Sequence, residues 1–330
     1  MIGHFLLAFT SIETFYLGLV MVVLGTGLLK PNISAIVGDL YEKNSDKKEA
    51  GFTIFYMSIN IGSILGFFIC GYLGENIGWH YGFGAAGIGM AFGLLQFLLT
   101  KNNLNKVGIK PSVEISKRQR KKELIYFNFF GILFLLFTVL GIIGYWEFNP
   151  VPLAGAMTVV IFSVAVIYFW YLFLLGNLNQ EEKRKIILIV VLFFGAALFW
   201  SGFDQAGSSF NIFAKEYTDR IILGWEYPAS WLQVLNPLLV VILSPFMAYL
   251  WIYLGKKMLD PSLPFKFGIG LILMAIGFIF IAIGANIALQ DGMASAKWLL
   301  LTYLFHTLGE LTLSPIGFCL LYTSPSPRDG

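Results

Sequence analysis

Three charged residues lie inside long apolar stretches of this 330-residue sequence: Lys30, Asp204 and Glu310. A charged side chain near the centre of a bilayer costs ~2.5 kcal/mol or more unless it is paired or hydrated. These residues therefore indicate an aqueous cavity, and Glu310 is the counter-ion that we expect for Lys30. The second acid then has no basic partner in this chain, which suits it to carry a proton.

Each of these charges could also have a simpler structural role. Lys30 could extend to the membrane surface, although about nine residues, or ~13 Å of helix, separate it from the charged edge at Asp39. Pro31, beside it, favours a kink or a local opening of the helix. Glu310 could be a protonated, hydrogen-bonded carboxyl group, and Asp204 could lie near the outer end of its helix. The charges alone leave both possibilities open.

Two asparagines, Asn60 and Asn236, also fall in the middle of apolar runs. Each could join two helices through a hydrogen bond, or could bind an amide or carboxylate group of a ligand. His306 precedes Glu310 by four residues, but with 3 histidines in the chain a packing role is favoured over a metal site. The sequence shows no motif of a nucleophilic, metal-dependent or nucleotide-binding enzyme, so we expect neither a metal nor enzymatic activity.

The composition requires lipid as the main solvent of the chain. Apolar residues make up 57% of the sequence and charged residues 12%, which is about half the charged fraction of a soluble domain. The net charge is +3, and no block of charges is long enough for a nucleic-acid site. Soluble enzymes and nucleic-acid-binding proteins are therefore excluded, and a membrane protein remains.

Runs of about 20 apolar residues predict transmembrane helices. Nine such spans cover approximately residues 14–37, 52–74, 81–100, 124–146, 152–175, 186–214, 229–255, 265–285 and 297–321. An apolar stub at Met1–Phe9 is too short to cross a bilayer, which suggests that the chain begins within a helix. Gly62-x-x-x-Gly66 and Gly89-x-x-x-Gly93 predict close packing between helices.

The basic residues are distributed unevenly between the loops. Seventeen of the 22 lie after the first, third, fifth and seventh spans, on one side of the membrane. The positive-inside rule places these loops in the cytoplasm. We therefore predict a multi-pass protein of the inner (cytoplasmic) membrane.

Six short motifs are spread along the chain. They are GTGLLKPNIS at 25–34, FYMSINIGS at 55–63, FWSGFDQAGSS at 199–209, WLQVLNP at 231–237, PFKFGIGL at 264–271 and GELTLSP at 309–315. In this order they resemble the motifs of the proton-dependent oligopeptide transporter (POT/PTR) family of the major facilitator superfamily, bacterial type. The resemblance runs from residue 1 to about residue 321.

The resemblance implies an all-α major facilitator fold that is incomplete here, with core helices 3 to 10 and two inserted helices. It assigns residues 1–100 to the N-terminal helix bundle, 101–123 to a basic cytoplasmic linker, 124–185 to the inserted helix pair and 186–321 to the C-terminal bundle. We expect the tail, 322–330, to be non-native or truncated. Core helices 1, 2, 11 and 12 have no counterpart in the sequence, and neither has the Glu-Glu-Arg motif of the first helix, so we expect a fragment.

The resemblance also implies roles for single residues. Lys30 and Glu310 would pair with each other and would bind the carboxylate and the amino group of a peptide. Asn60 and Asn236 would hold the peptide backbone. Asp204 takes the position of a proton-coupling and gating acid, a role that it would share with Lys30 and Glu310.

The implied function is symport of di- and tripeptides with protons by alternating access. Ser314 would contribute to substrate binding, and Tyr56 and Trp200 would line the pocket. No cofactor is expected beyond the coupling proton, and the expected partners are peptides, protons and the lipid bilayer, with no nucleic acid. The same fold could instead transport nitrate or another small solute, or could serve as a non-transporting peptide sensor.

Overall fold

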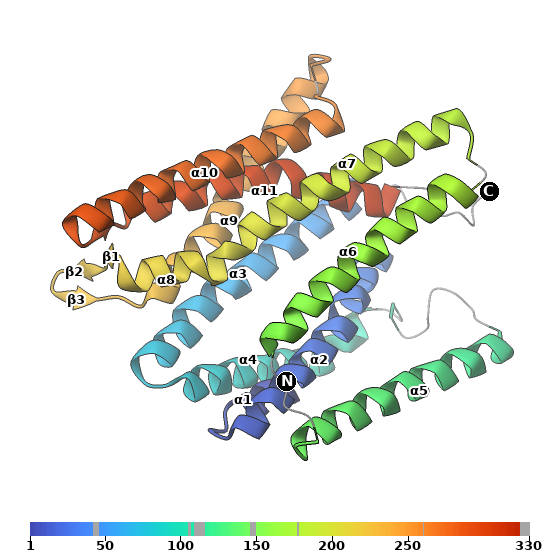
Figure 1. Cartoon of the computed structure of the whole chain (residues 1–330), viewed down its shortest axis with the longest axis horizontal. Coiled ribbons are helices and arrows are strands. Elements are labelled where there is room, and N and C mark those ends of the chain that lie inside the picture. The colour runs from blue at the N-terminus through green and yellow to red at the C-terminus, as the bar shows by residue number, and fades with distance from the viewer. Residues whose placement is uncertain are drawn as a thin grey trace. The chain divides into compact units, whose positions relative to one another are not determined.

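The computed structural model describes residues 1–41, 46–104, 107–108, 116–145, 150–176, 178–259 and 261–323, which are mainly helical (Figure 1). Each predicted span falls on a helix of this described part. The long helices are α2 (Ile12–Asp39), α3 (Asp46–Asn76), α4 (Trp79–Thr100), α5 (Lys117–Ile142), α6 (Pro150–Leu175), α7 (Gln180–Phe203), α9 (Leu235–Lys256), α10 (Leu263–Asp291) and α11 (Lys297–Thr323). Within the described residues, 8 helical stretches are long and apolar enough to cross a membrane.

Shorter elements connect the long helices. They are α1 (Ile2–Leu7), α8 (Ser209–Glu216), the 3-10 helices η1 (Lys101–Leu104), η2 (Asp204–Gly207) and η3 (Ala229–Val234), and the strands β1 (Thr218–Asp219), β2 (Ile221–Ile222), β3 (Trp225–Glu226) and β4 (Ala294–Ser295). β1 pairs in parallel with β4, and β2 forms an antiparallel hairpin with β3. The apolar stub at the start of the sequence is the helix α1, which packs against α2 and α4.

The predicted span 186–214 is not a single helix. α7 ends at Phe203, η2 follows, and α8 begins after Ser208. The side-chain carbonyl of Gln205 accepts hydrogen bonds from the hydroxyl groups of Ser208 and Ser209 at 3.3 and 2.7 Å. The backbone N–H of Ser208 donates to the carbonyl of Gln205 at 3.2 Å, and this three-residue bond belongs to the 3-10 turn rather than to an α-helix. The prediction gives the helical region correctly, but it is wrong that one continuous helix covers residues 186–214.

Pro31 does not open its helix. α2 continues through this residue as one helix of 28 residues. Asn32 donates its side-chain amide to the carbonyl of Leu28 at 2.6 Å, and Ser34 donates its hydroxyl to the carbonyl of Lys30 at 3.0 Å. These bonds use carbonyl groups in the turn around the proline, where Pro31 itself supplies no N–H.

The glycine pairs singled out in the sequence make no close helix contact with the described part of the chain. A Cβ atom built on Gly62, Gly66, Gly89 or Gly93 would meet no neighbouring atom within 4 Å in the described part of the chain. The close approaches occur at other glycines, such as Gly277 of α10, where a Cβ atom would overlap the His306 ring of α11. Spacing alone cannot tell these cases apart, because glycine is frequent in membrane helices for several reasons.

The chain divides into two compact units, which are residues 1–103 with 191–330, and residues 104–190. The second unit holds α5 and α6. In the first unit α10 lies against α11, α9 packs against α11, and α3 contacts both η3 and α9. α3 therefore connects the first hundred residues with the helices of the second half. The assignment of two half-bundles, a linker and an inserted pair stays a prediction.

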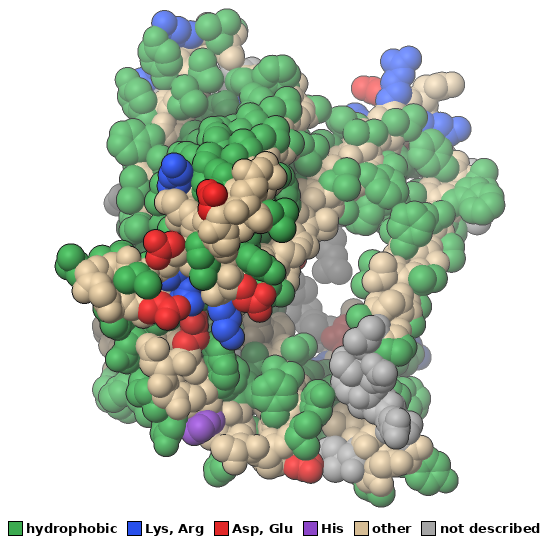
Figure 2. All heavy atoms as spheres, turned by 60° about the vertical axis from the view of Figure 1, so that its left-hand side comes forward, with side chains coloured by type: hydrophobic (Ala, Val, Ile, Leu, Met, Phe, Trp, Pro, Cys, Tyr) green, Lys and Arg blue, Asp and Glu red, His purple; other side chains and the backbone are tan. Residues whose placement is uncertain are grey.

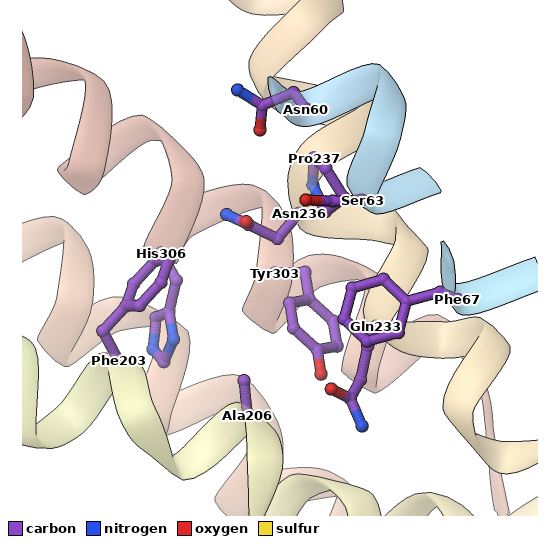
Figure 3. Close-up of a pocket in the computed structure, with 10 residues that line it drawn as sticks. All are labelled: Asn60, Ser63, Phe67, Phe203, Ala206, Gln233, Asn236, Pro237, Tyr303 and His306. Carbon is purple, nitrogen blue, oxygen red and sulfur yellow. The ribbon is translucent and has the colours of Figure 1, made fainter. Parts of the chain in front are cut away.

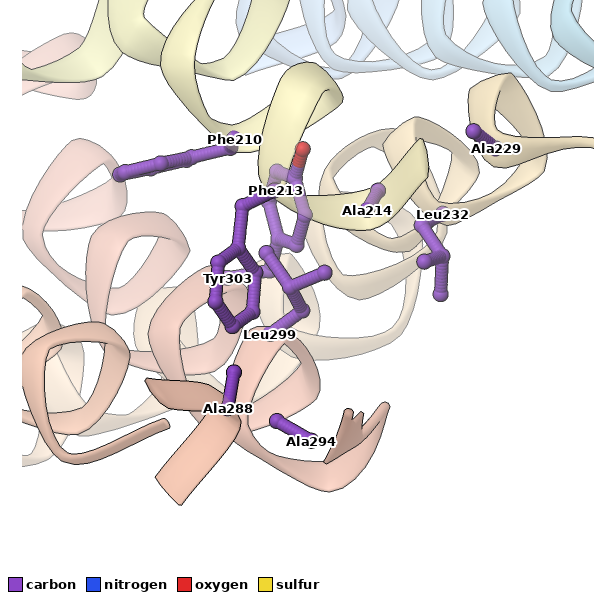
Figure 4. Packing of buried hydrophobic residues seen from close by; sticks show 9 residues of the cluster. All are labelled: Phe210, Phe213, Ala214, Ala229, Leu232, Ala288, Ala294, Leu299 and Tyr303. Carbon is purple, nitrogen blue, oxygen red and sulfur yellow. The ribbon is translucent and has the colours of Figure 1, made fainter. Parts of the chain in front are cut away.

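A buried apolar cluster joins α8, η3, α10 and α11 (Figure 4). Its members are Phe210, Phe213, Ala214, Ala229, Leu232, Ala288, Ala294, Leu299 and Tyr303. By contrast, hydrophobic side chains cover most of the face shown in Figure 2, and the apolar windows of α5 and α6 contain no buried residue. An apolar exterior around apolar helices is what lipid requires, and the chain is a multi-pass membrane protein.

We predict that Leu299→Ala destabilises the protein, because Leu299 is 0% exposed within this cluster. The loss of packing is expected to cost about 2–5 kcal/mol of unfolding free energy. The matched control is Leu300→Ala one residue later, at a side chain that is 47% exposed. Thermal unfolding in detergent should show a lower midpoint for the first variant alone, and equal midpoints would contradict the packing.

Candidate functional site

The first unit contains a cavity of about 180 Å³ (Figure 3). Four segments contribute to it, namely α3, the α7–η2 junction, the η3–α9 junction and α11. The lining residues are Asn60, Ser63, Phe67, Phe203, Ala206, Gln233, Asn236, Pro237, Tyr303 and His306. Amide, hydroxyl and imidazole groups share this lining with aromatic rings, so the cavity suits a ligand that is polar and partly apolar.

Glu310 of α11 joins three of these segments through hydrogen bonds. Its Oε1 accepts a hydrogen bond from the Tyr56 hydroxyl at 3.2 Å, and its Oε2 accepts one from Asn236 Nδ2 at 2.9 Å. Asn236 Nδ2 also lies 3.1 Å from the hydroxyl oxygen of Thr307, which is fully buried. The residues Tyr56, Asn236 and Glu310 form the acid cluster, which ties α3 to α9 and α11.

The acid cluster leaves the carboxyl group without a cation. Glu310 is 8% exposed, and its two hydrogen-bond donors are neutral. An ionised carboxylate that is removed from water needs a positive partner or a proton. Glu310 can therefore bind a cationic group of a ligand or take up a proton, and both of these events change its bonds to α3 and α9.

Lys30 does not form the ion pair that we expected with Glu310. Its side chain is exposed on α2. Among the residues that the structure describes, the ion pair between side chains joins Arg220 and Glu226 at 2.6 Å. The expectation is wrong for this conformation, in which Lys30 is exposed and the carboxyl group accepts hydrogen bonds from neutral donors of α3 and α9.

Asp204 and Trp200 lie beside the cavity rather than in its described lining. Asp204 is exposed and begins η2, directly after the end of α7. Trp200 is 43% exposed, and its ring makes an edge contact with Phe203 at a centroid distance of 5.3 Å. Phe203 and Ala206 are the residues through which this segment reaches the cavity.

The two asparagines line the same cavity, whereas Tyr56, which we expected to line the pocket, lies outside its described lining and contacts Glu310. Asn60 is 8% exposed, lines the cavity and donates its Nδ2 to the carbonyl of Tyr56 at 2.9 Å. Asn236 lines the same cavity from α9. Ser314 is part of α11, but its side chain lies outside the described residues. The binding and gating roles of all these residues stay predictions.

Sequence reasoning missed Ser63, three residues after Asn60, and two further polar residues of the lining. Gln233 precedes Asn236 by three residues, one helical turn, and donates its Nε2 to Asn211 Oδ1 at 3.2 Å. Tyr303 lies seven residues before Glu310, two turns along the same face of α11. Helical spacing from the residues already singled out was the signal that could have identified all three.

His306 both packs between helices and lines the cavity. It is 2% exposed, and its ring lies 5.0 Å from Phe278 and 5.5 Å from Phe210 between centroids. This agrees with the packing role favoured from the sequence. In the described part of the chain, no group of three or more His, Cys, Asp or Glu residues is arranged to hold a metal ion.

The helices and the cavity define a multi-pass membrane protein with a polar cavity between its spans. The chain belongs to the POT family, whose model matches residues 1–328. The family and the all-α fold predicted from the sequence are thereby confirmed.

Similar proteins agree with this membership. The chain is 37% identical to a peptide transporter of Yersinia enterocolitica, over 97% of this chain and 65% of the relative. It is 31% identical to a di-/tripeptide transporter of Lactococcus lactis, over 96% and 64%. A crystal structure of a peptide transporter POT in complex with sulfate matches with a TM-score of 0.85 and 33% identity, over 97% and 64%. The chain thus spans less than two thirds of the length of each of these proteins.

We predict that Gly277→Ala separates α10 from α11 and disturbs the cavity wall at His306. The added methyl group would overlap His306 Cδ2, and relief of this overlap is expected to cost about 1–3 kcal/mol of unfolding free energy. Gly268→Ala on the same helix is the control, because a Cβ atom there meets nothing within 4 Å. Thermal stability should fall for the first variant and stay level or rise slightly for the second; the reverse order would rule out this close approach.

Proposed function

We propose that this chain is the substrate-binding part of a symporter that moves di- and tripeptides with protons across the cytoplasmic membrane. The observation that carries the proposal is the acid cluster, in which a buried carboxyl group beside a polar cavity joins α3 to α9 and α11. The two similar transporters of Yersinia and Lactococcus support the choice of peptides as substrates.

The cavity offers a complementary group for each part of a short peptide. The Glu310 carboxylate would bind the ammonium group, because each of its oxygens can accept a further hydrogen bond besides the one it now accepts. The side-chain amides of Asn60, Asn236 and Gln233 can donate to peptide carbonyls and accept from peptide N–H groups. Aromatic rings of the lining would contact apolar side chains. Lys30 would bind the peptide carboxylate after a movement of α2.

Proton coupling follows from the same carboxyl group. A proton on Glu310 turns the carboxylate into a neutral group with one O–H donor, which weakens the hydrogen bonds that it now accepts from Tyr56 and Asn236. The contact between α3 and the helices of the second half then weakens, which allows alternating access. Asp204 would be the second proton-coupling acid, and no cofactor other than the proton is proposed. The basic loops would face the cytoplasm.

Nitrate transport is the weaker alternative. The described lining of the cavity contains no Lys or Arg, and its residue Asn236 donates to the acidic Glu310. An anion would gain nothing from this carboxylate, whereas a zwitterionic peptide can use it. A peptide sensor would share the binding site but would not accumulate its ligand. Enzymatic activity is not proposed, because the family relatives are transporters.

The test is uptake of a labelled dipeptide into proteoliposomes under an inward proton gradient, with the protein in the longest form that its gene encodes. Glu310→Gln should lower gradient-driven accumulation by about 10- to 100-fold, the factor expected when a charge-assisted hydrogen bond is lost. Glu181→Gln, at an exposed acid of α7, should leave accumulation unchanged.

Three other results would count against the proposal. Full gradient-driven uptake by Glu310→Gln would show that this carboxyl group does not couple the proton. Nitrate that competes with the dipeptide would support the alternative substrate. Saturable binding without accumulation under any gradient would support a sensor.

A further inference from the structure

The C-terminal end of α3 is attached to the start of η3 by a single carboxylate. Glu75 Oε2 accepts a hydrogen bond from the backbone N–H of Ala229 at 2.9 Å, and Glu75 Oε1 accepts one from the N–H of Ser230 at 2.8 Å. Backbone N–H groups in a first helical turn have no acceptor within their own helix. Glu75 supplies both acceptors from a position 154 and 155 residues earlier in the chain.

The surrounding contacts are close. The indole N–H of Trp231 donates to the carbonyl of Phe68 at 3.2 Å, and the two rings meet edge to face at 4.9 Å. A Cβ atom at Gly71 would overlap Ser230 Oγ. A side chain at position 71 would force the Ser230 hydroxyl to rotate away, so α3 approaches η3 closely here. We call Phe68, Gly71 and Glu75 with Ala229, Ser230 and Trp231 the α3–η3 contact.

The α3–η3 contact lies at one end of the cavity. Phe67 lines the cavity from α3, and Glu75 follows it by eight residues, or ~12 Å along the helix. Gln233 lines the cavity from η3, three residues after Ser230. The loop between α3 and α4 is on the opposite side of the predicted topology from the basic loops. The contact would therefore close the cavity at its outer end.

We propose that Glu75 is a positioning residue of the outer gate, whose carboxylate holds α3 on η3 while the cavity is closed to the outside. The contact breaks each time the cavity opens outward, because α3 and η3 then separate. This proposal rests on the proposed function, which supplies the alternation between an outward-open and an inward-open state. This gate contact differs in kind from the acid cluster. The donors to Glu75 are backbone N–H groups, which do not titrate and which a side-chain substitution at Ala229 or Ser230 would not remove.

A purely structural role for Glu75 predicts a different behaviour. A lost helix-end contact that only loosens the protein would expose the cavity from both sides of the membrane. A lost gate contact changes the balance between two states, so access from outside rises while access from inside falls. The two roles can therefore be separated by measurement of access from each side.

The experiment uses Ser63→Cys as a reporter in the cavity, in the longest form of the protein, with Cys70→Ala and Cys319→Ala as background. A membrane-impermeant maleimide is applied to right-side-out and to inside-out vesicles without any peptide. Glu75→Gln keeps the shape of the side chain and loses its charge. It should label about tenfold faster from outside, the factor for one charge-assisted hydrogen bond, and more slowly from inside.

Two further variants sharpen the result. Glu75→Asp keeps the charge and should restore labelling toward the rates of the parent protein. Glu216→Gln removes an acid on the same predicted side of the membrane, from an exposed position at the end of α8, and should change neither rate.

Equal rates in Glu75→Gln and the parent, or faster labelling from both sides, would overturn the gate role. Equally faster labelling of the Glu216→Gln variant would also overturn the gate role, because loss of any negative charge on this side of the membrane would then suffice for the effect. Labelling needs no transported substrate. If Glu75→Gln shifts the ratio of outside to inside labelling but the protein takes up no peptide, the gate role stands and the proposed function is rejected. If the protein takes up peptide but Glu75→Gln leaves this ratio unchanged, the proposed function stands and the gate role is rejected.

Discussion

A carboxyl group inside a membrane protein must find its hydrogen-bond donors in the protein, because the hydrocarbon core of the bilayer supplies none. Glu310 meets this constraint with Tyr56 from α3 and Asn236 from α9, at 3.2 and 2.9 Å. Three helices that are distant in sequence are thereby held together at one depth. The cavity lies beside this point, and its polar lining comes from the same helices within about two turns.

α3 carries two contacts of different chemistry to the second half of the chain. Tyr56 meets a side-chain carboxyl group near the cavity, whereas Glu75, about 28 Å further along the helix, meets backbone N–H groups of η3. In the proposed function, a proton or a peptide acts directly on the first contact alone. The second contact must follow through the helix, which is continuous over 31 residues and can transmit a tilt as a rigid body.

The sequence predicts the spans well because apolar runs of membrane length seldom occur outside transmembrane helices. It also identifies Asn60, Asn236 and Glu310, since polar residues in such runs are conspicuous. It could not identify Gln233 or Glu75 as easily. Gln233 lies at the start of an apolar run, and Glu75 resembles an ordinary acid at a helix end; their roles depend on which element packs opposite them.

The Lys30 prediction failed for a related reason. Opposite charges in a sequence predict a pair, but they do not show which neutral donors lie closer to the acid in a given conformation. In the same way, the turn after Phe203 is accompanied by hydrogen bonds that Ser208 and Ser209 donate to Gln205, which the apolar character of the run conceals.

The two accepting oxygens of Glu310 also limit what the site can do. Tyr56 and Asn236 each use one acceptor site of the carboxylate, and Lys30 or a peptide ammonium would share the same two oxygens with them. A proton on Glu310 removes the negative charge on which all of these hydrogen bonds draw. Substrate, proton and helix contact therefore depend on one pair of atoms, and this dependence is sufficient to couple them.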